Sequence, residues 1–556
     1  MDEFMLKNNA GYVSSTRSAV LTQGGLVCSA SPLAGSIGAN VLKSGGNAFD
    51  AAIAVAAAEA VVLPPMCGIG GEVFALLYES SSGKVYDITG SGRAPKNATA
   101  EYFTSKGYTK MPPEGPLTPT VPGELHAWQT ILEQFGTQDL ANLIAPAIRL
   151  ADQGFPLPGR IGTYFKAYKD KISNYPSTKK IYLNGDSPFV PGDLLVQKDL
   201  AETLRRISSK GIGEFYQGAL AEEIADAITS AGGLMTSEDL AGQKTVVTEA
   251  KASTNYRGNT VFASAPPSQG YMLLEVLNIL ENYDLRSMGW GSAESIHLMV
   301  EALKLGFIDR LHYLGDPDFI DVPLNTIISK EYAKIRSESI DPKFSSNDPS
   351  AGTPDQLQSG TSQSTSYFNV IDSQGNCVSF IHSLSQYFGS GFVAGNTGVL
   401  LNDRAGRGFY LVENHPNVIA PLKRSMNTIQ AYMVIKDGRP ILVGGTPGGD
   451  RQPSWNIQMI TALLDYGVNV QAAADTPRWH HFPGSDPATS DLPFELRFEE
   501  GFDDETLKSL SNKGHDVKPV PEGQTPGAVQ LIQINPLSNT RIGGTDRRSD
   551  GYPMPE

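Results

Sequence analysis

The sequence predicts a layered α+β fold in which helices cover stacked antiparallel sheets. Apolar residues recur at helical spacing through much of residues 39–314. A stretch almost free of apolar side chains follows at 343–364, and from Thr365 onward the chain is rich in short β-type runs separated by turns. A helix-rich first part and a strand-rich second part are typical of this fold class. At 556 residues the chain can form several domains or one large layered unit.

The helical pattern begins in residues 39–63. Gly45 and Gly46 end one helix there, and Asn47 opens the next helix with Asp50 in its first turn. The apolar run at 51–66 is rich in alanine, contains a glutamate and is too short to cross a bilayer, so we expect a buried helix. Further helical patterns occupy 120–160, 195–235 and 268–314.

A glycine-rich turn follows the first helices. Gly68, Gly70 and Gly71 precede an apolar strand at 73–78. A dinucleotide-binding fingerprint needs the opposite order, a strand before the glycines and a helix after them. The sequence therefore disfavours a nicotinamide enzyme. It also contains no nucleophile elbow, zinc-binding helix, phosphate loop or paired-cysteine motif.

The second part of the chain opens with a predicted β-hairpin. Its two strands, 365–372 and 377–384, are joined by a short polar turn that contains Gly375. Further strands are expected at 398–401, 431–435 and 441–443, followed by a helix at 455–466. The last sixty residues predict two or three more strands, in the runs "FELRFE" and "AVQLIQI".

The charge and composition of the chain favour some classes of binding partner over others. The chain has 44 Lys and Arg against 59 Asp and Glu, a net charge of −15, and no basic cluster. This balance argues against nucleic acid or an anionic membrane and favours a small-molecule or peptide substrate. Residues 1–20 lack the apolar core of a secretory signal, so we expect a cytoplasmic protein.

The cysteines and histidines do not predict a metal site or a cofactor. Cys28, Cys67 and Cys377 are widely spaced and odd in number, which favours buried free thiols over disulfides. His480 and His481 are adjacent, and neighbouring residues rarely share one ion. We expect neither metal nor cofactor.

Thr365 stands where the polar segment meets the hairpin. A threonine hydroxyl is a weak nucleophile unless a base lies beside it. A free α-amino group on the same residue, with a pKa of about 7.7–8.0, can be that base, but only if the chain is cut before the threonine. From the residues alone two interpretations stay open: a self-cleaving nucleophile, or a Ser/Thr-rich loop that leads into an ordinary hairpin.

Over residues 25–546 the chain resembles the γ-glutamyltransferase family of N-terminal-nucleophile hydrolases, and eight segments in family order carry the resemblance. They are "GGNAFDAAIA", "CGIGGEVFALLY", "TVPGELHAW", "LGFIDRLHYLGDP", "STSYFNVIDSQGNCVS", "FGSGFVAGNTGVLLND", "GGTPGGDRQPSWNIQMI" and "DYGVNVQAAADTPRWHH". The resemblance implies the stacked αββα architecture of these hydrolases. With Asp372 and Gly375 aligned to the family signature, the nucleophile is Thr365; Thr361, Ser364 and Ser366 lie close enough to be alternatives.

The resemblance also implies a mechanism. Thr365 cuts the bond that precedes it, which leaves a large subunit, 1–364, that ends in the mobile linker 343–364, and a small subunit, 365–556, together forming one αββα unit. The product is a heterodimer of the two fragments, with further dimerisation left open. Ser383 corresponds to a second hydroxyl that supports the threonine, and Gly448 and Gly449 to the pair whose amides stabilise the oxyanion.

Several positions depart from the γ-glutamyl pattern. Arg407 occupies the place of the acidic residue that binds the substrate's α-amine, and the arginine that binds the α-carboxylate is shifted from Ser91 to Arg93. The pattern is similar to the branch with cephalosporin-acylase-like and oxamate-amidohydrolase-like members, and it implies a carboxylate-bearing substrate without a nearby ammonium. The alternative is that these arginines pair with protein carboxylates. The substrate-binding residues implied are Arg93, Ser385, Arg404, Arg407, Arg424 and Ser425.

The expected function is that of a self-processing amidohydrolase or acyltransferase. It would cleave the amide of a small carboxylate-bearing acyl group, γ-glutamyl or a dicarboxylic monoamide, through a threonine acyl-enzyme. The alternative from another class is a catalytically silent family member that acts as a binding or scaffold protein.

Overall fold

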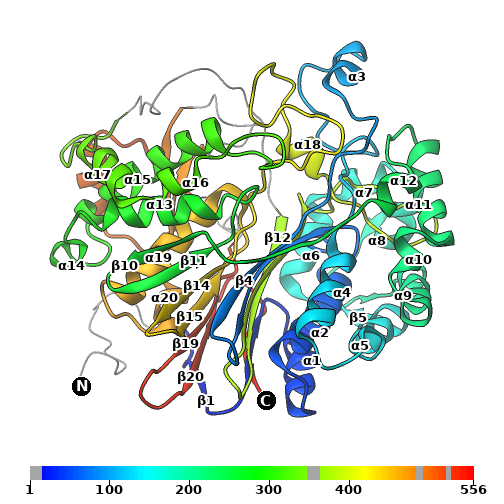
Figure 1. Ribbon diagram of the computed structural model, residues 1–556, viewed down its shortest axis with the longest axis horizontal. Coiled ribbons are helices and arrows are strands. Elements are labelled where there is room, and N and C mark those ends of the chain that lie inside the picture. Colours follow the sequence, from blue (N-terminus) through cyan, green and yellow to red (C-terminus); the bar gives the residue numbers. More distant parts are fainter. Residues whose placement is uncertain (1–14, 347–363, 484–492, 521–526) are drawn as a thin grey trace.

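Two stacked antiparallel sheets of seven strands each form the centre of the protein, and helices cover both outer faces (Figure 1). The computed structural model describes residues 15–346, 364–483, 493–520 and 527–556. The predicted αββα arrangement is confirmed.

The first sheet carries the predicted hairpin at its centre. Its strands, in spatial order, are β21 (Tyr552–Pro555), β2 (Leu26–Ser29), β12 (Ser364–Ile371), β13 (Cys377–Ser385), β3 (Glu72–Glu79), β4 (Lys84–Gly90) and β9 (Val246–Glu249). All pairings in this sheet are antiparallel.

The second sheet packs on β2, β12 and β13 of the first sheet, mainly through β15, β19 and β20. Its order is β1 (Val20–Thr22), β20 (Arg541–Thr545), β19 (Gln530–Ile534), β15 (Arg439–Gly445), β14 (Tyr432–Lys436), β11 (Asn259–Ala263) and β10 (Ser253–Tyr256). Both sheets thus combine strands from before and after residue 364.

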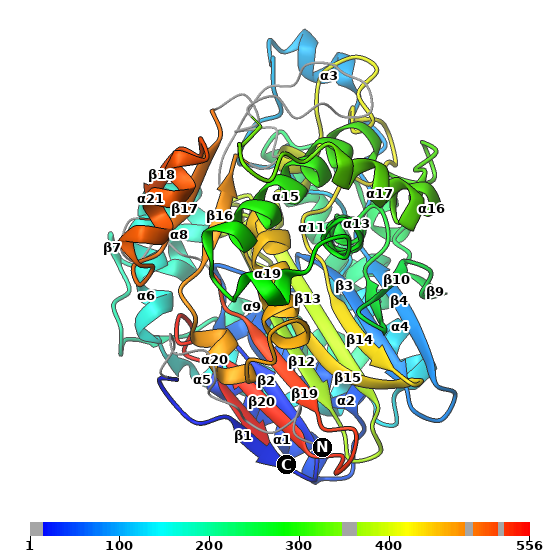
Figure 2. The ribbon, with the colours of Figure 1, turned by 90° about the vertical axis from the view of Figure 1, so that its left-hand side faces the viewer.

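One helical layer covers the first sheet, on the right in Figure 1. It is formed mainly by α1 (Pro32–Lys43), α2 (Ala48–Val62), α4 (Glu124–Phe135), α5 (Leu140–Gln153), α9 (Lys198–Lys210), α10 (Gly213–Tyr216), α11 (Ala219–Ser230) and α12 (Ser237–Ala241). The layer over the second sheet, shown from its own side in Figure 2, contains α13 (Gly270–Leu280), α15 (Ala293–Tyr313), α17 (Lys330–Glu338), α19 (Gln452–Leu464) and α20 (Val470–Asp475).

Shorter elements connect these layers. The helices are α3 (Ala100–Ser105), α6 (Gly159–Ala167), α7 (Lys169–Ser173), α8 (Pro176–Tyr182), α14 (Leu285–Met288), α16 (Leu324–Ile327), α18 (Arg404–Gly408), the 3₁₀ turn Gly449–Arg451 and α21 (Asp504–Asn512). The strands are β5 (Phe155–Pro156), β6 (Leu183–Asn184), β7 (Ser187–Pro188), β8 (Leu194–Leu195), β16 (Trp479–Phe482), β17 (Glu495–Phe498) and β18 (Val517–Pro519).

Helix α2 is the central helix of its layer. Asn47 and Asp50 form a reciprocal capping box at its start, as the sequence indicates, and every residue of the helix is buried. It packs directly on β12 and β13. Along these two strands alternate side chains face α2, and the others face the second sheet, because successive side chains of a strand point to opposite faces.

The sequence-based element predictions need two corrections. Residues 398–401 are not a strand: Leu400 and Leu401 form only isolated bridges, and the left-handed backbone at Gly395 and Gly398 turns the chain there. The first part of the chain is helix-rich as predicted, but it also contributes β4, β9, β10 and β11 to the sheets, which the sequence analysis did not predict. Most of the predicted mobile linker, 347–363, lies outside the described residues.

Among the described residues, no helix has the length and apolar character needed to span a bilayer.

Candidate active site

Thr365 lies in a β-bulge at the start of β12. The ladder pairs Ser364 with Ser385 and Ser366 with His382, so Thr365 stands opposite two residues of β13. Its side chain is buried, and its Oγ1 lies 3.2 Å from the Oγ of Ser383. The structure therefore brings the two predicted hydroxyl groups together on the face of β12 and β13 that is turned toward the second sheet.

Ser383 and Ser385 form the β13 side of the site. The amide of Ser385 donates to Ser383 Oγ at 2.8 Å. Ser385 has a positive φ of 81°, unusual for a residue other than glycine, and its buried hydroxyl has no hydrogen-bond partner within the described residues. The glycine-rich turn before β3 packs closely on this strand. A Cβ on Gly71 would lie 2.5 Å from the Ser383 carbonyl oxygen. The glycine thus lets the turn pack against the strand that carries Ser383.

Gly448 and Gly449 follow the end of β15, in the second sheet. Gly445, three residues before them, packs on Tyr367, two residues after the nucleophile candidate: a Cβ there would lie 2.4 Å from the Tyr367 ring. The glycine pair and Thr365 therefore lie at the same end of the two stacked sheets. Both glycines are buried with positive φ, and neither amide hydrogen has an acceptor among the residues described.

Arg404 and Arg407 lie on α18, close to the serines. Arg404 is fully buried and its Nε contacts Glu72, which also accepts a hydrogen bond from Ser91 at 2.8 Å. Neither Nη atom of Arg404 has a partner in the part of the chain that the structure describes. Arg407 is buried and donates to the carbonyl oxygen of Ser385 at 3.2 Å. Arg404 therefore contacts the carboxylate of Glu72 through its Nε.

Arg93 and Arg424 lie together with two aspartates. Arg93 pairs with Asp318 at 2.5 Å, and Arg424 with the same carboxylate at 3.2 Å, while Asp316 accepts from the Arg424 amide at 2.7 Å. Both guanidinium groups thus have acidic protein partners, the alternative that the sequence left open. The predicted neighbour Ser425 donates to the carbonyl of Met426.

Arg451 was not singled out as a site residue from the sequence, although it stands directly after the glycine turn. It forms no ion pair or side-chain hydrogen bond with any described residue. Burial, together with repulsion from Arg497 and Arg407, lowers the pKa of Arg451 to about 10. Burial and the nearby Arg407 also lower the pKa of Arg404, against the effect of Glu72. Arg407 therefore repels both Arg404 and Arg451, and we call these three residues the arginine cluster.

Two groups of side chains in the described residues have donor atoms near enough to share a metal ion. They are Glu59, Cys67 and His382, and His297, Glu301 and His515. The nitrogens of His382 already face carboxylates at 2.8 and 2.9 Å, and His297 contacts His515 and the Asp341 carbonyl, both at 2.8 Å. His480 and His481 belong to neither group.

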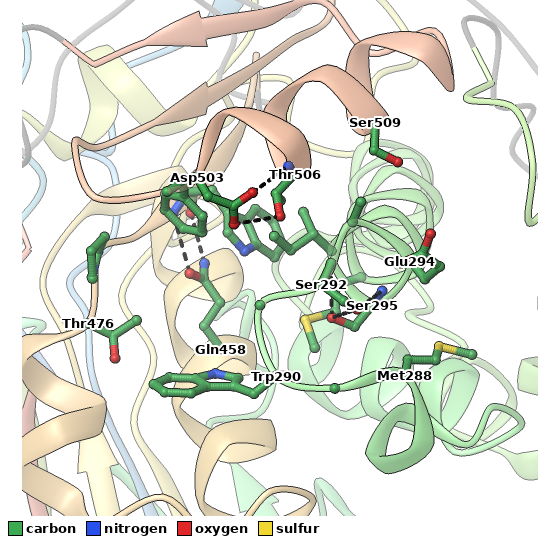
Figure 3. A pocket seen from close by; sticks show the side chains of 18 of the residues that line it. Met288, Trp290, Ser292, Glu294, Ser295, Gln458, Thr476, Asp503, Thr506 and Ser509 are labelled. Carbon is green, nitrogen blue, oxygen red and sulfur yellow. Dashed lines mark hydrogen bonds between the residues drawn. The ribbon is translucent and has the colours of Figure 1, made fainter. Parts of the chain in front are cut away.

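A cavity of about 950 Å³ lies apart from this site (Figure 3). The start of α15, helix α19 and the segment around Asp503 line it, with Trp290 and Gln458 on its walls. None of the predicted catalytic or substrate-binding residues contributes to it.

The stacked αββα fold is that of the N-terminal-nucleophile hydrolases. The family model described as gamma-glutamyltranspeptidase matches residues 34–556, and the chain belongs to this family. It is 38% identical to the glutathione hydrolase-like YwrD proenzyme of Bacillus subtilis (strain 168), over 95% of this chain and 97% of the relative. It is 36% identical to the glutathione hydrolase proenzyme of Escherichia coli (strain K12), over 94% and 90%.

A solved structure shows the same likeness over the whole fold. The cephalosporin acylase from Bacillus halodurans superposes with a TM-score of 0.89 at 33% identity, over 99% of both chains. The predicted family is confirmed, and the chain is an enzyme of this family.

Proposed function

We propose that the chain cuts itself between Ser364 and Thr365 and then uses Thr365 to hydrolyse the amide of a small acyl group that carries a carboxylate. The observation that carries this proposal is the pair of buried hydroxyl groups, Thr365 Oγ1 and Ser383 Oγ, 3.2 Å apart in a bulge beside the arginine cluster. The proenzyme names of the relatives support a processing step.

In the self-cleavage step the Thr365 hydroxyl attacks the carbonyl carbon of Ser364. The C–N bond breaks, an ester forms on Oγ1, and the nitrogen takes up a proton to become an α-amine. Water then hydrolyses the ester, which leaves a carboxylate on Ser364 and a free hydroxyl on Thr365. Ser383 is suited to hold Oγ1 in place during the attack.

In the catalytic step the new α-amine takes the proton from the Thr365 hydroxyl as it attacks the substrate amide. The amine returns the proton to the leaving nitrogen, and an acyl ester remains on Oγ1. The amides of Gly448 and Gly449, for which no acceptor occurs among the described residues, would stabilise the negative oxygen of the tetrahedral intermediate. Water, or an acceptor amine, then releases the acyl group.

The arginine cluster supports a carboxylate on the acyl group. The acidic groups that act on these three guanidinium groups are Glu72, bound to Arg404; Asp450, beside Arg451; and Asp403, whose pKa is raised by burial although the neighbouring cations oppose the shift. A substrate carboxylate would relieve the repulsion. An ammonium beside it, as in a γ-glutamyl group, would be repelled. We therefore favour a dicarboxylic monoamide over glutathione.

The proposal is tested by intact mass and N-terminal sequencing of purified protein. The 59.6 kDa chain, divided into 364 and 192 of its 556 residues, gives fragments of about 39 and about 21 kDa, the smaller beginning Thr-Ser-Tyr-Phe. An uncut chain would contradict the proposal and favour a silent binding or scaffold protein. Activity from a fragment that begins elsewhere would assign the nucleophile to another residue.

A further inference from the structure

A buried ionic network lies behind the candidate active site, on the face of β12 and β13 that packs against α2. Its centre is Glu59 of α2, which is fully buried. Glu59 Oε2 accepts a hydrogen bond from Ser366 Oγ at 2.5 Å and lies 2.9 Å from His382 Nε2. Ser366 directly follows Thr365, and His382 directly precedes Ser383. One carboxylate oxygen thus holds a neighbour of each candidate catalytic hydroxyl.

The two residues that Glu59 holds are also a cross-strand pair. Ser366 and His382 form the last regular step of the ladder before the bulge that contains Thr365. A bulge interrupts the pairing of the strands, so the position of Thr365 depends on what fixes the ladder beside it. Glu59 ties both strands together at that step.

Further contacts fix the network from two other elements. Ser29 of β2 donates to Glu59 Oε1 at 2.6 Å, and Glu124 of α4 lies 2.8 Å from His382 Nδ1. Trp128 donates to the same Glu124 oxygen at 3.0 Å. The imidazole therefore lies between two carboxylates.

The neighbours of His382 favour the charged form of its imidazole. Burial alone would lower the pKa of His382, but Cys67 and Glu124 beside the ring raise it well above the ordinary value. Short hydrogen bonds to charged groups are stronger and more directional than neutral ones.

We propose that Glu59 is a positioning residue, which holds the bulge through Ser366 and His382 and thereby sets the distance between the hydroxyls of Thr365 and Ser383. This role rests on the proposed function. Burying an ion pair contributes little net stability compared with apolar packing, so stability alone gives weak reason for such a network. Catalysis gives a better one, because a nucleophile misplaced by about 1 Å can lose on the order of 10²-fold in rate.

The test compares two serines of the same hairpin. Ser366→Ala removes the hydroxyl that binds Glu59. Ser379→Ala is the matched control: this residue is equally buried and pairs with Asn369, away from the bulge, and its hydroxyl bonds Tyr367 at 2.8 Å and the Gly444 carbonyl oxygen at 3.4 Å. Each variant loses the hydrogen bonds of one buried hydroxyl, so similar falls in melting temperature are expected. The readouts are kcat and KM for amide hydrolysis and the rate of self-cleavage.

Ser366→Ala should lower kcat and the self-cleavage rate about tenfold with little change in KM, because a small shift of the nucleophile acts on the chemical step. Ser379→Ala should stay within about twofold of wild type. Glu59→Gln, which keeps the shape of the side chain, should reduce kcat at least as much as Ser366→Ala.

Equal kcat values for both serine variants, whether reduced or unchanged, would overturn the positioning role. The proposed function fails separately, if the wild-type chain is never cut before Thr365. A cut and active wild type with indistinguishable serine variants overturns only the role of Glu59.

Discussion

Replacement of Arg407 by leucine should remove much of the preference for a carboxylate-bearing acyl group. Arg407 is 4% exposed and donates to the carbonyl oxygen of Ser385, so we expect its guanidinium to meet a substrate carboxylate in a site with little water. A hydrogen bond to a charged group contributes about 1.5–3 kcal/mol. This corresponds to a loss of about 10- to 150-fold in kcat/KM for a carboxylate-bearing substrate.

The assay uses three anilides that differ only in the acyl group: glutaryl, with a carboxylate; γ-glutamyl, with a carboxylate and an ammonium; and butyryl, with neither. Wild-type enzyme should prefer glutaryl. Arg407→Leu should lower the glutaryl rate by the factor above and change the butyryl rate less than about threefold, since the neutral acyl group makes no ionic contact. Arg407→Lys, which keeps the charge, is the matched control and should lose less.

The reasoning about Arg407 is refuted by either of two results. One is an unchanged ratio of glutaryl to butyryl rates in Arg407→Leu. The other is a wild-type enzyme that turns over the γ-glutamyl anilide alone, because a cation at this position repels the substrate ammonium.

Three further predictions concern processing, the oxyanion site and acid stability. Thr365→Ala should abolish both fragments on a denaturing gel; fragments of unchanged size would place the cut elsewhere. Gly448→Ala should lower kcat about 10²–10³-fold, because a Cβ would lie 2.4 Å from the Trp455 ring and displace the amide; Gly438→Ala, with open space around the Cβ, is the control for backbone strain. Burial opposes the charge of Asp546, but two adjacent arginines lower its pKa to about 2. Its contribution, about 2–3 kcal/mol, is present above pH 4 and lost as the pH falls toward 2, so the melting temperature of Asp546→Asn should lie below wild type at pH 7 and approach it at pH 2.

Much of the fold could be predicted because its signals are local. The capping box at Asn47 and the apolar strands around a short turn each depend on residues near in sequence, and the hairpin appears where it was expected. The edge strands β9 and β10 have only partly apolar sides, so alternation alone did not reveal them. The bridges at Leu400 and Leu401 are short and glycine-bounded, and a run of apolar letters there resembles a strand.

The residues of the candidate site could be predicted from the sequence where they belong to a motif. The roles of the arginines could not, because these roles depend on which acidic groups lie beside them in the fold. Thr365, Ser383 and the two glycines belong to quoted segments. Whether an arginine faces a substrate or a protein carboxylate depends on partners such as Asp318, which lies about a hundred residues from Arg424 in sequence. Glu59 appeared only as an interruption of an alanine-rich helix, and its contact with Ser366, 307 residues away, has no sequence signal.

The interleaving of strands bears on what a cut before Thr365 would leave behind. In the first sheet β2, from the early part of the chain, is hydrogen-bonded between β21 and β12, both from the later part. Strands of the two pieces would alternate within one hydrogen-bonded sheet, so separating the pieces would break backbone hydrogen bonds inside the sheet. Such a protein has to reach its final shape as one polypeptide first, and separately produced halves would have no simple docking route to each other.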